Sequence, residues 1–201
     1  MIIDPKSLSS RDAYRLLVSC IVPRPIAFIT SVDAKGKVNA APYSFFNALS
    51  AAPPLLIVSA VRKKGAKKKT TENVLSKGEF VVNMVTESLV ESMNLSSGDF
   101  PPEVSKVEQL GLSLLPSESV SVPRIAESPV NCECVLTKHL TLADETLDLL
   151  IGEIRRYHID DSLIADGVVD QKRLRSVARM GGKYYAVIER LFELDSPKPR
   201  K

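Results

Sequence analysis

The sequence predicts a mainly β fold, a closed antiparallel barrel with a few helices on its outside. Segments rich in apolar and β-branched residues outnumber those with helical periodicity. Two of them flank the turn sequence DAKGK, which predicts a β-hairpin, and the last one alternates apolar with polar residues. Strands are expected at residues 24–31, 38–41, 55–61, 79–85, 130–141, 147–159 and 184–194.

Three short helices are expected around these strands. The first is capped by Ser9 or Ser10 and ends before Pro23, because a residue that precedes proline avoids helical geometry. The second lies between strands 55–61 and 79–85, with Thr70 or Thr71 as its N-cap and Gly78 just past its end, where a left-handed residue is usual. Thr86 is predicted to cap the third, which stops near residues 96–98.

Three segments are expected to be irregular. Residues 100–127 are rich in Pro, Ser and Glu, which favours a surface excursion that acts as a lid or faces a partner. Residues 162–182 are predicted to form a loop with one helical turn, and the tail 196–201 is predicted to be disordered. The 201 residues, 1–201, are expected to form one domain.

Composition and charge limit the function classes. The net charge of +3 is too small to favour a nucleic-acid partner. No apolar stretch approaches the roughly 20 residues that span a bilayer, and the first residues lack the pattern of a secretory signal. A cytoplasmic protein without a membrane partner is therefore expected. Cys20, Cys132 and Cys134 show no disulfide framework, and Cys132, Cys134 and His139 lack a second ligand pair, so no metal is predicted.

Residues 38–50, VNAAPYSFFNALS, are a candidate site for a planar ligand. Small side chains allow backbone groups to approach such a ligand, and Asn39, Ser44 and Asn47 can hydrogen-bond its polar edge. The alternative is a strand end and turn whose phenylalanines belong to the core.

Residues 59–73, SAVRKKGAKKKTTEN, are a candidate phosphate site. A dense basic run leads into a helix start, where unpaired N–H groups, hydroxyl groups and cations can all receive an anion. A solvated lysine loop and a nucleic-acid contact are the alternatives, although the run lacks interleaved aromatic residues.

Two weaker signals lie nearer the C-terminus. Residues 176–185, SVARMGGKYY, contain a glycine pair beside Arg179 and two tyrosines, which indicates a close backbone approach to a ring or a simple turn. His158 is a candidate acid or base, but a lone histidine at a strand end is more often structural.

Taken in order, these segments resemble the flavin reductase-like family of FMN-binding split barrels. The matching pieces are RPIAFITS, NAAPYSFFN, PPLLIVSA, KKTTEN, EFVVNMV, GEI with His158 downstream, and ARMGGKYY, and they cover nearly the whole chain. The resemblance implies an antiparallel split β-barrel of Greek-key type with a few peripheral helices. It also implies a homodimer that holds FMN in a groove at its interface.

The resemblance further implies which residues contact the cofactor. The flavin ring would lie against a strand and turn, and the phosphate against the basic loop, where the usual Lys-Asp-Thr of the family reads Lys-Lys-Thr here. His158, Arg179 and the glycine pair would line the nicotinamide or acceptor side. The implied FMN contacts are Thr30, Ser31, Asn39, Pro42, Tyr43, Ser44, Phe45, Phe46, Asn47, Ser59, Arg62, Lys68, Lys69, Thr70, Thr71, Asn73, Arg179, Gly181 and Gly182.

The activity implied is an FMN oxidoreductase that passes electrons from NADH or NADPH to a flavin or to another small-molecule or protein acceptor. In such enzymes the flavin carries the chemistry, and the protein positions donor and acceptor. Two alternatives stay open. One is a flavin-binding electron carrier or sensor that works with a protein partner through residues 100–127 and does not oxidise NAD(P)H. The other is an oxidase similar to the pyridoxamine phosphate oxidase branch of split barrels.

Overall fold

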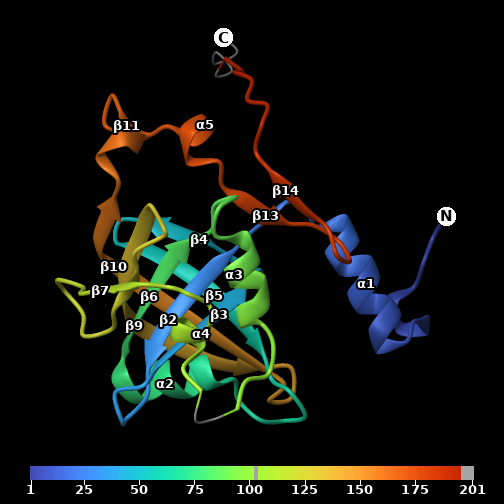
Figure 1. The fold of residues 1–201 in the computed structure, drawn as a ribbon. Helices are drawn as coiled ribbons and strands as arrows, with labels where there is room; N and C mark the ends of the chain where they lie inside the picture. The colour runs from blue at the N-terminus through green and yellow to red at the C-terminus, as the bar shows by residue number, and fades with distance from the viewer. Residues whose placement is uncertain (102–103, 196–201) are drawn as a thin grey trace.

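The fold is built on one curled antiparallel sheet. The computed structural model describes residues 1–101 and 104–195. Seven strands pair in the order β3-β2-β6-β9-β10-β5-β4, and the sheet curls into a barrel (Figure 1). These strands are β2 (Ala27–Val32), β3 (Val38–Tyr43), β4 (Phe46–Ala51), β5 (Pro54–Val61), β6 (Glu79–Met84), β9 (Val130–Leu142) and β10 (Leu147–Ile159).

The barrel closes without a continuous ladder. β3 approaches β5 at the seam. The Ser59 N–H, which donates to the carbonyl of Phe45 at 2.8 Å, extends the β4–β5 hairpin by one pair. β3 and β4 are the two edge strands of the sheet, and among the described residues no strand pairing joins β3 to β4 or β5. The expected antiparallel barrel is confirmed, and its seam is split rather than fully hydrogen-bonded.

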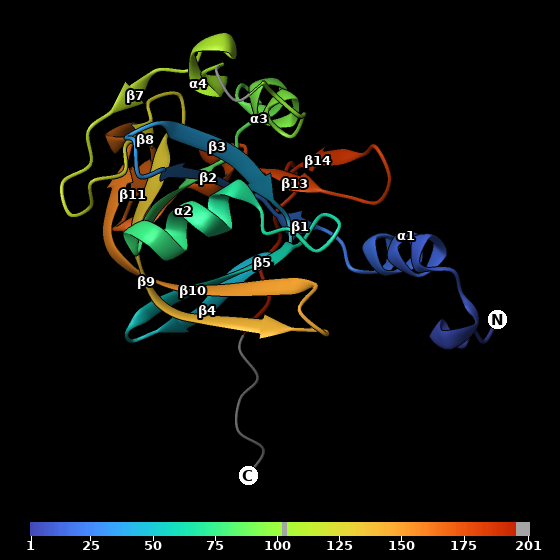
Figure 2. The same ribbon diagram turned by 90° about the horizontal axis from the view of Figure 1, so that it is seen from below.

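Short helices and strands surround the barrel, and α2 lies across one end of it (Figure 2). The helices are η1 (Pro5–Ser7), α1 (Ser10–Cys20), α2 (Lys69–Lys77), α3 (Val90–Ser96), α4 (Lys106–Gln109), η2 (Asp161–Leu163) and α5 (Gln171–Leu174). The short strands are β1 (Arg24–Pro25), β7 (Leu114–Leu115), β8 (Arg124–Ile125), β11 (Ile164–Ala165), β12 (Val168–Val169), β13 (Val177–Arg179) and β14 (Tyr185–Val187).

Strand β2 is buried on both of its faces. Ala27 and Ile29 belong to the cluster inside the barrel, together with Phe80 of β6. Phe28, which points the other way, belongs to a second cluster beneath α3 and α4. Strand β2 is therefore paired along both edges and packed on both faces. This fixes the position of the strand, which carries two of the expected site residues.

A close contact fixes one glycine of the barrel. A Cβ atom placed on Gly152 of β10 would lie 2.4 Å from Cζ of Phe80. The ring of Phe80 is fully buried, so it has no free space into which it could move. Gly152 is required because the phenylalanine ring fills the space that a side chain would need.

The two cysteines of β9 are free and buried. Cys132 and Cys134 both belong to the cluster inside the barrel, so their side chains share a face. Burial raises the pKa of Cys132 to about 12 and also raises that of Cys134. Both side chains are therefore protonated packing groups at neutral pH.

The caps of two helices differ from the prediction. Lys68 is the N-cap of α2, and Thr70 and Thr71 lie inside the first turn with their side chains buried. Leu89, not Thr86, is the N-cap of α3, and neither helix has a side-chain capping bond. In α2 the barrel buries both threonine hydroxyls, and this tertiary burial overrides the capping preference. Gly78 ends α2 in the left-handed conformation, with φ 73°, as expected.

Three strand predictions need correction. The segment 24–31 divides into β1, which pairs with β13, and β2, which pairs with β3 and β6. β4 was missed, because most of its side chains are exposed and show no apolar alternation. The segment 184–194 forms a strand only over Tyr185–Val187, because β13 is three residues long and offers no partner beyond them.

The segment 100–127 is more ordered than an irregular excursion. Its described part contains α4, β7 and β8, and it places Val107, Val122 and Ile125 in the core. The segment 162–182 contains α5 as its one helical turn, together with short strands. The predicted disorder of 196–201 lies outside the described residues.

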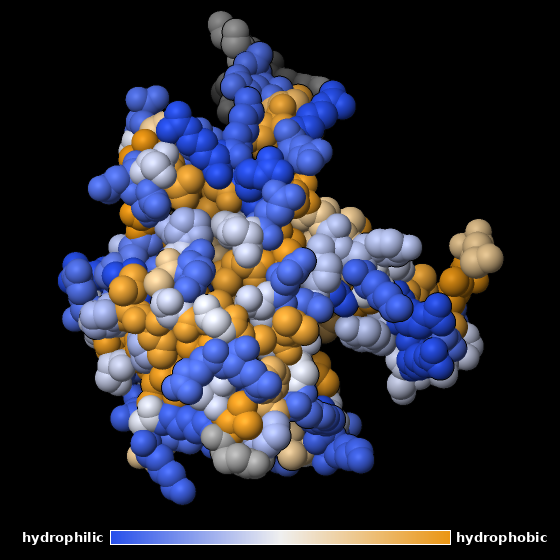
Figure 3. Space-filling view, in the orientation of Figure 1, coloured by the Kyte–Doolittle hydropathy of each residue, from blue (hydrophilic) through white to orange (hydrophobic). Residues whose placement is uncertain are grey.

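Helix α1 stands away from the barrel (Figures 1 and 3). It begins after the Ser9 cap, as predicted, and ends before Pro23. Val18 is its one buried residue. Tyr14, Leu17 and Ile21, which follows its end, expose about half of their surface (58%, 47% and 57%).

Candidate functional site

The start of α2 meets the end of β2 and the start of β3 at one end of the barrel. Asn39 of β3 donates from Nδ2 to Oγ1 of Thr70 at 3.0 Å. Asn73, one turn along α2, donates from Nδ2 to Oγ of Ser31 at 3.1 Å. These two bonds bring together four of the residues that the resemblance implied, from three different elements.

The side chain of Tyr43 also reaches Thr70 in the first turn of α2. Burial raises the pKa of its phenol, and a hydrogen bond with Thr70 opposes this shift. Tyr43, Asn39 and Thr70 therefore form a cluster of polar side chains between β3 and the first turn of α2.

The first turn of α2 has unused hydrogen-bonding capacity. Its N-cap, Lys68, makes no side-chain bond to the helix, and the N–H groups of the first turn have no intrahelical acceptor. The hydroxyl of Thr71 is buried and has no hydrogen-bond partner among the described residues. Buried polar groups without partners are rare, and this one sits at the positive end of a helix dipole. The arrangement suits a bound anion.

The basic loop before α2 supplies cations, but Arg62 is largely committed elsewhere. Its Nε and Nη2 donate to the two carboxylate oxygens of buried Asp148, both at 2.9 Å. His139 contacts the same carboxylate at 2.9 Å from Nε2. The hydrogen bond from Arg62 is the main cause that lowers the pKa of Asp148, and burial opposes it. Two of the donors on the Arg62 guanidinium are thus used within the protein.

The lysines of the same loop are more accessible. Lys63 pairs with Asp99 at 2.8 Å, and Lys69 approaches Glu72 of the same helix at 3.9 Å. Both ion pairs are solvent-exposed and therefore weak, so a more highly charged anion could displace the two carboxylates from these lysines. Lys68 is itself the N-cap residue of α2.

Residues 42–47 are divided between the core and the surface. Pro42 pairs with Phe28 at the end of β3, and Phe46 packs partly buried against the barrel interior. Asn47 is exposed, and its Oδ1 accepts from the N–H of Ala48 at 2.8 Å. Ser44 and Phe45 form the bend between the strands. Phe46 therefore packs on the core, as the alternative interpretation of this segment proposed, whereas Ser44 and Phe45 lie partly buried in the bend.

Thr30 and Ser59 are placed differently from their neighbours. Thr30 is fully buried, and its hydroxyl donates to the carbonyl of Pro123 at 2.7 Å. Ser59 is partly buried on β5, where it pairs with Leu149 of β10. Thr30 therefore belongs to an internal network that ties β2 to the segment before β8.

His158 has a structural partner. Its Nε2 contacts Oε1 of Glu133 at 2.5 Å. The Glu133 carboxylate is fully buried and also accepts from the N–H groups of Glu118 and Ser119. Burial alone would raise the pKa of Glu133, but these hydrogen bonds lower it. The cluster fastens residues 118–119 to β9 and β10, and the catalytic assignment of His158 stays a prediction.

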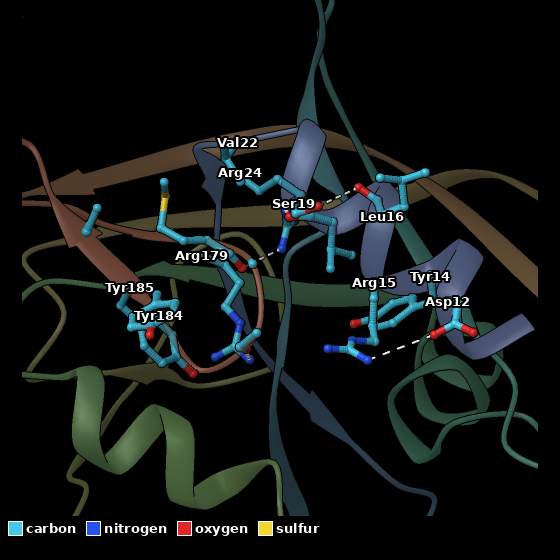
Figure 4. Close-up of a pocket in the computed structure, with 15 residues that line it drawn as sticks. Asp12, Tyr14, Arg15, Leu16, Ser19, Val22, Arg24, Arg179, Tyr184 and Tyr185 are labelled. Carbon is cyan, nitrogen blue, oxygen red and sulfur yellow. Dashed lines mark hydrogen bonds and ion pairs between the residues drawn. The ribbon is translucent and has the colours of Figure 1, made fainter. Parts of the chain in front are cut away.

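Arg179, Gly181 and Gly182 lie in a second place, a groove of about 910 Å³ between α1 and the turn from β13 to β14 (Figure 4). Arg179 covers the ring of Tyr185 at 4.4 Å, and its Nη2 donates to the carbonyl of Gly182 at 2.7 Å. Within one chain, the described contacts do not join this groove to the start of α2.

Sequence reasoning missed three charged residues that organise these places. Asp148 and Glu133 are buried carboxylates in long strands, and Arg24 is a buried guanidinium whose Nη1 and Nη2 bond three carbonyls. A charged residue at an inward position of a strand is the signal that could have found the carboxylates. Among the described residues, no cluster of side chains suits a metal ion, and no helix is long and apolar enough to span a membrane.

Known proteins are similar to this chain in sequence and in fold. Nitrilotriacetate monooxygenase component B from Bacillus cereus is 39% identical, with a TM-score of 0.93 over 96% of this chain and 98% of that one. The 2-nitrobenzoate 2-nitroreductase NbaA of Pseudomonas fluorescens is 33% identical, with a TM-score of 0.89 over 98% and 96%. An uncharacterised protein of Halalkalibacterium halodurans is 44% identical over 98% of this chain and 97% of its own length.

The family model of the flavin reductase like domain matches residues 18–178, which include the whole barrel and the groove-lining Arg24. The two solved structures cover nearly the full length of both chains. The resemblance seen in the ordered motifs is therefore confirmed, and the chain belongs to the flavin reductase-like family of split barrels.

Proposed function

We propose that the protein is an FMN-dependent oxidoreductase whose phosphate site is the first turn of α2. The observation that carries the proposal is the buried, unpartnered hydroxyl of Thr71 beside an uncapped helix start. A phosphate monoester offers acceptor oxygens to that hydroxyl and to the free N–H groups of the turn.

The surrounding residues fit such a dianion. Neutral hydroxyl and amide groups, from Thr70 and Asn39, border the turn and are already oriented by their mutual hydrogen bond. Cationic side chains follow one another in the preceding loop, at Arg62, Lys63, Lys64, Lys67, Lys68 and Lys69. Cations near a helix N-terminus repel its dipole, so this crowding is favourable only when an anion lies among them.

The residues of β3 and the following bend would orient the rest of the molecule. Tyr43 and Asn39 offer polar groups next to the helix, and the bend at Ser44 and Phe45 offers backbone groups. When bound, FMN would supply the redox chemistry by accepting a hydride and returning electrons to a second substrate. The protein's part is to bind, to orient and to exclude water.

NADH or NADPH is proposed as the donor, and a small molecule or a protein as the acceptor. Two relatives support the reductase assignment, since one is named as a nitroreductase and the other as a component of a monooxygenase. Arg179, Gly181 and Gly182 are proposed to line the donor or acceptor side, because they border a groove large enough for a small substrate.

A homodimer is also proposed. An isolated helix of 11 residues is marginal in water, and α1 buries only Val18 against its own chain. Its exposed Leu17 would be covered by a second copy, and so would the apolar side chains of the C-terminal segment, Ile188, Leu191, Phe192 and Leu194.

The test is an absorbance spectrum of the purified protein with FMN, followed by anaerobic addition of each nicotinamide. Bound flavin with rapid bleaching by NADH or NADPH supports the proposal. Bleaching only when a partner protein is added would replace the reductase with the electron carrier. Protein that takes up no FMN would refute both.

A further inference from the structure

The groove between α1 and the β13–β14 turn has walls that are fixed at one end. The guanidinium of Arg24 donates from Nη1 to the carbonyl of Val18 at 2.7 Å and from Nη2 to the carbonyl of Met180 at 3.0 Å. A Cβ atom on Gly181 would lie 3.2 Å from Cα of Ser19, so the turn rests directly on the helix. The groove is therefore a built feature that does not depend on loosely placed loops.

The groove carries excess positive charge. Arg15, Arg24 and Arg179 line it against one acid, Asp12. Asp12 lies 3.9 Å from Arg15, and both side chains are mostly exposed. Arg24 and Arg179 have no carboxylate partner among the described residues, and Nε of Arg24, a residue only 6% exposed, is buried without any hydrogen-bond partner.

Arg24 and Arg179, the two arginines without a carboxylate partner among the described residues, line the same groove. Burial lowers the pKa of Arg24, the Tyr14 side chain opposes this, and the positive charge of Arg179 adds to it. Like charges on one wall of a groove are costly when no anion lies between them and the solvent. This wall is therefore suited to a negatively charged group.

The groove is also rich in aromatic rings. Tyr14, Tyr184 and Tyr185 line it, which is three of the five tyrosines in the chain. Figure 4 shows Tyr14 and Arg15 on the α1 side and Arg179, Tyr184 and Tyr185 on the opposite side. Tyr14 and Tyr184 are 58% and 76% exposed, so their ring faces are accessible to a planar molecule.

We propose that this groove binds a small aromatic carboxylate. The carboxylate would meet the guanidinium of Arg179, whose planar donors match two oxygens, and the ring would stack on the accessible tyrosines. Arg24 acts as a positioning residue that holds both walls. The inference deepens the proposed function and rests on it for the ligand's role as the second substrate, but the binding itself needs no flavin.

Calorimetric titration tests the proposal with benzoate and with neutral benzamide as probes, on flavin-free and on FMN-loaded protein. Benzoate is expected to bind at least about ten-fold more tightly than benzamide, since a charge-assisted hydrogen bond contributes that much. The chain has no tryptophan, so quenching of tyrosine fluorescence reports the same binding.

Two arginine variants and one control locate the site. Arg179→Gln is expected to weaken benzoate about ten-fold, and Arg15→Gln, on the exposed helix, to weaken it less. Arg11→Gln is the control, because Arg11 lies on α1 but does not line the groove. Benzoate affinity that is unchanged in Arg179→Gln overturns the proposal, and so does equal binding of benzamide or of inorganic phosphate.

The outcomes separate this proposal from the proposed function. Protein that binds benzoate through Arg179 but takes up no FMN would refute the flavin assignment alone. Protein that binds FMN but no benzoate, because a second copy fills the groove, would refute the carboxylate site alone.

Discussion

Asn39 and Thr70 join the barrel wall to the helix that covers its end, through one hydrogen bond of 3.0 Å from Nδ2 to Oγ1. The hydroxyl of the neighbouring Thr71 has no partner among the described residues, although the side chains of Thr70 and Thr71 are both buried. The hydroxyl of Thr70 thus bonds within the fold, whereas we propose that the hydroxyl of Thr71 bonds a ligand. This difference allows a comparison of two nearly identical substitutions.

Thr71→Val is expected to weaken FMN binding about ten-fold while leaving the flavin-free protein as stable as the wild type. The hydroxyl has no partner to lose, and valine keeps its shape. Fluorescence titration of FMN and urea unfolding measure the two effects. Thr70→Val is the matched comparison and should also destabilise the flavin-free protein, by about 1 kcal/mol, because it leaves the partly buried Asn39 amide without the acceptor that the Thr70 hydroxyl provides. Equal losses of stability in both variants would contradict the assignment.

Asp148→Asn is expected to destabilise the fold by about 3–5 kcal/mol at neutral pH, because it breaks a buried ion pair with Arg62. The pKa of Asp148 is lower in the folded than in the unfolded state, so its stabilising effect is complete above about pH 4 and is lost as the pH falls through the folded pKa. Urea unfolding across this range should show the wild type and the variant converging in acid. A difference that is independent of pH would exclude this explanation.

Glu133→Gln should loosen the segment that precedes β8. The carboxylate holds the N–H groups of Glu118 and Ser119 and contacts His158, and an amide cannot replace all three bonds. We expect a loss of about 1–3 kcal/mol and faster amide exchange at residues 118–119, measured by hydrogen exchange. Exchange that accelerates equally throughout the barrel would point to general unfolding instead.

Gly152→Ala is expected to be destabilising by about 1–3 kcal/mol, since its methyl group would lie 2.4 Å from the ring of Phe80. Combining it with Phe80→Leu removes the clash, so the double variant should be more stable than the sum of the two single effects. Thermal unfolding of the four proteins in this cycle gives the coupling. Strict additivity would show that the barrel relaxes around the new methyl group.

Leu17→Glu should shift the protein from dimer to monomer. Leu17 is 47% exposed on a helix that buries only Val18, so the charge costs the monomer little but would be buried in a dimer interface. Light scattering coupled to gel filtration measures the mass. Arg11→Glu, on the same helix, is the control for charge alone. A wild-type protein with the mass of a monomer would refute the proposed homodimer.

Local pattern was enough to predict the parts of the fold whose partners are near in sequence. β10 begins and ends where its apolar pattern does, at Leu147 and Ile159, and Gly78 ends α2 because no other residue adopts its conformation so easily. The strand at 184–194 was predicted too long, because the alternation of apolar and polar residues indicates which side chains face the core but not whether a neighbouring strand is present to hydrogen-bond the backbone. The pairing of β14 with β13 ends at Val187, and beyond it the described residues of this segment make only one long backbone bond, from the Ile188 N–H to the carbonyl of Ser176 at 3.4 Å.

The site was predictable in composition but not in detail. The basic loop and the hydroxyl pair marked a phosphate site, yet the sequence suggested that the threonines cap α2, whereas Lys68 occupies that position. The bond from Arg62 to Asp148 joins residues 86 positions apart, and that from Arg24 to Met180 joins residues 156 apart. No local pattern encodes such contacts, so the commitment of Arg62 and the fixed walls of the groove emerge only from the folded chain.

The central claim is that the first turn of α2 receives the phosphate of FMN, and riboflavin, which lacks only that phosphate, tests it most directly. Titration of the flavin-free protein with both compounds should give FMN an advantage of at least about 100-fold, because several charge-assisted hydrogen bonds are lost with the phosphate. Thr71→Val should reduce that advantage and leave riboflavin affinity unchanged. Riboflavin that binds as tightly as FMN would contradict the account.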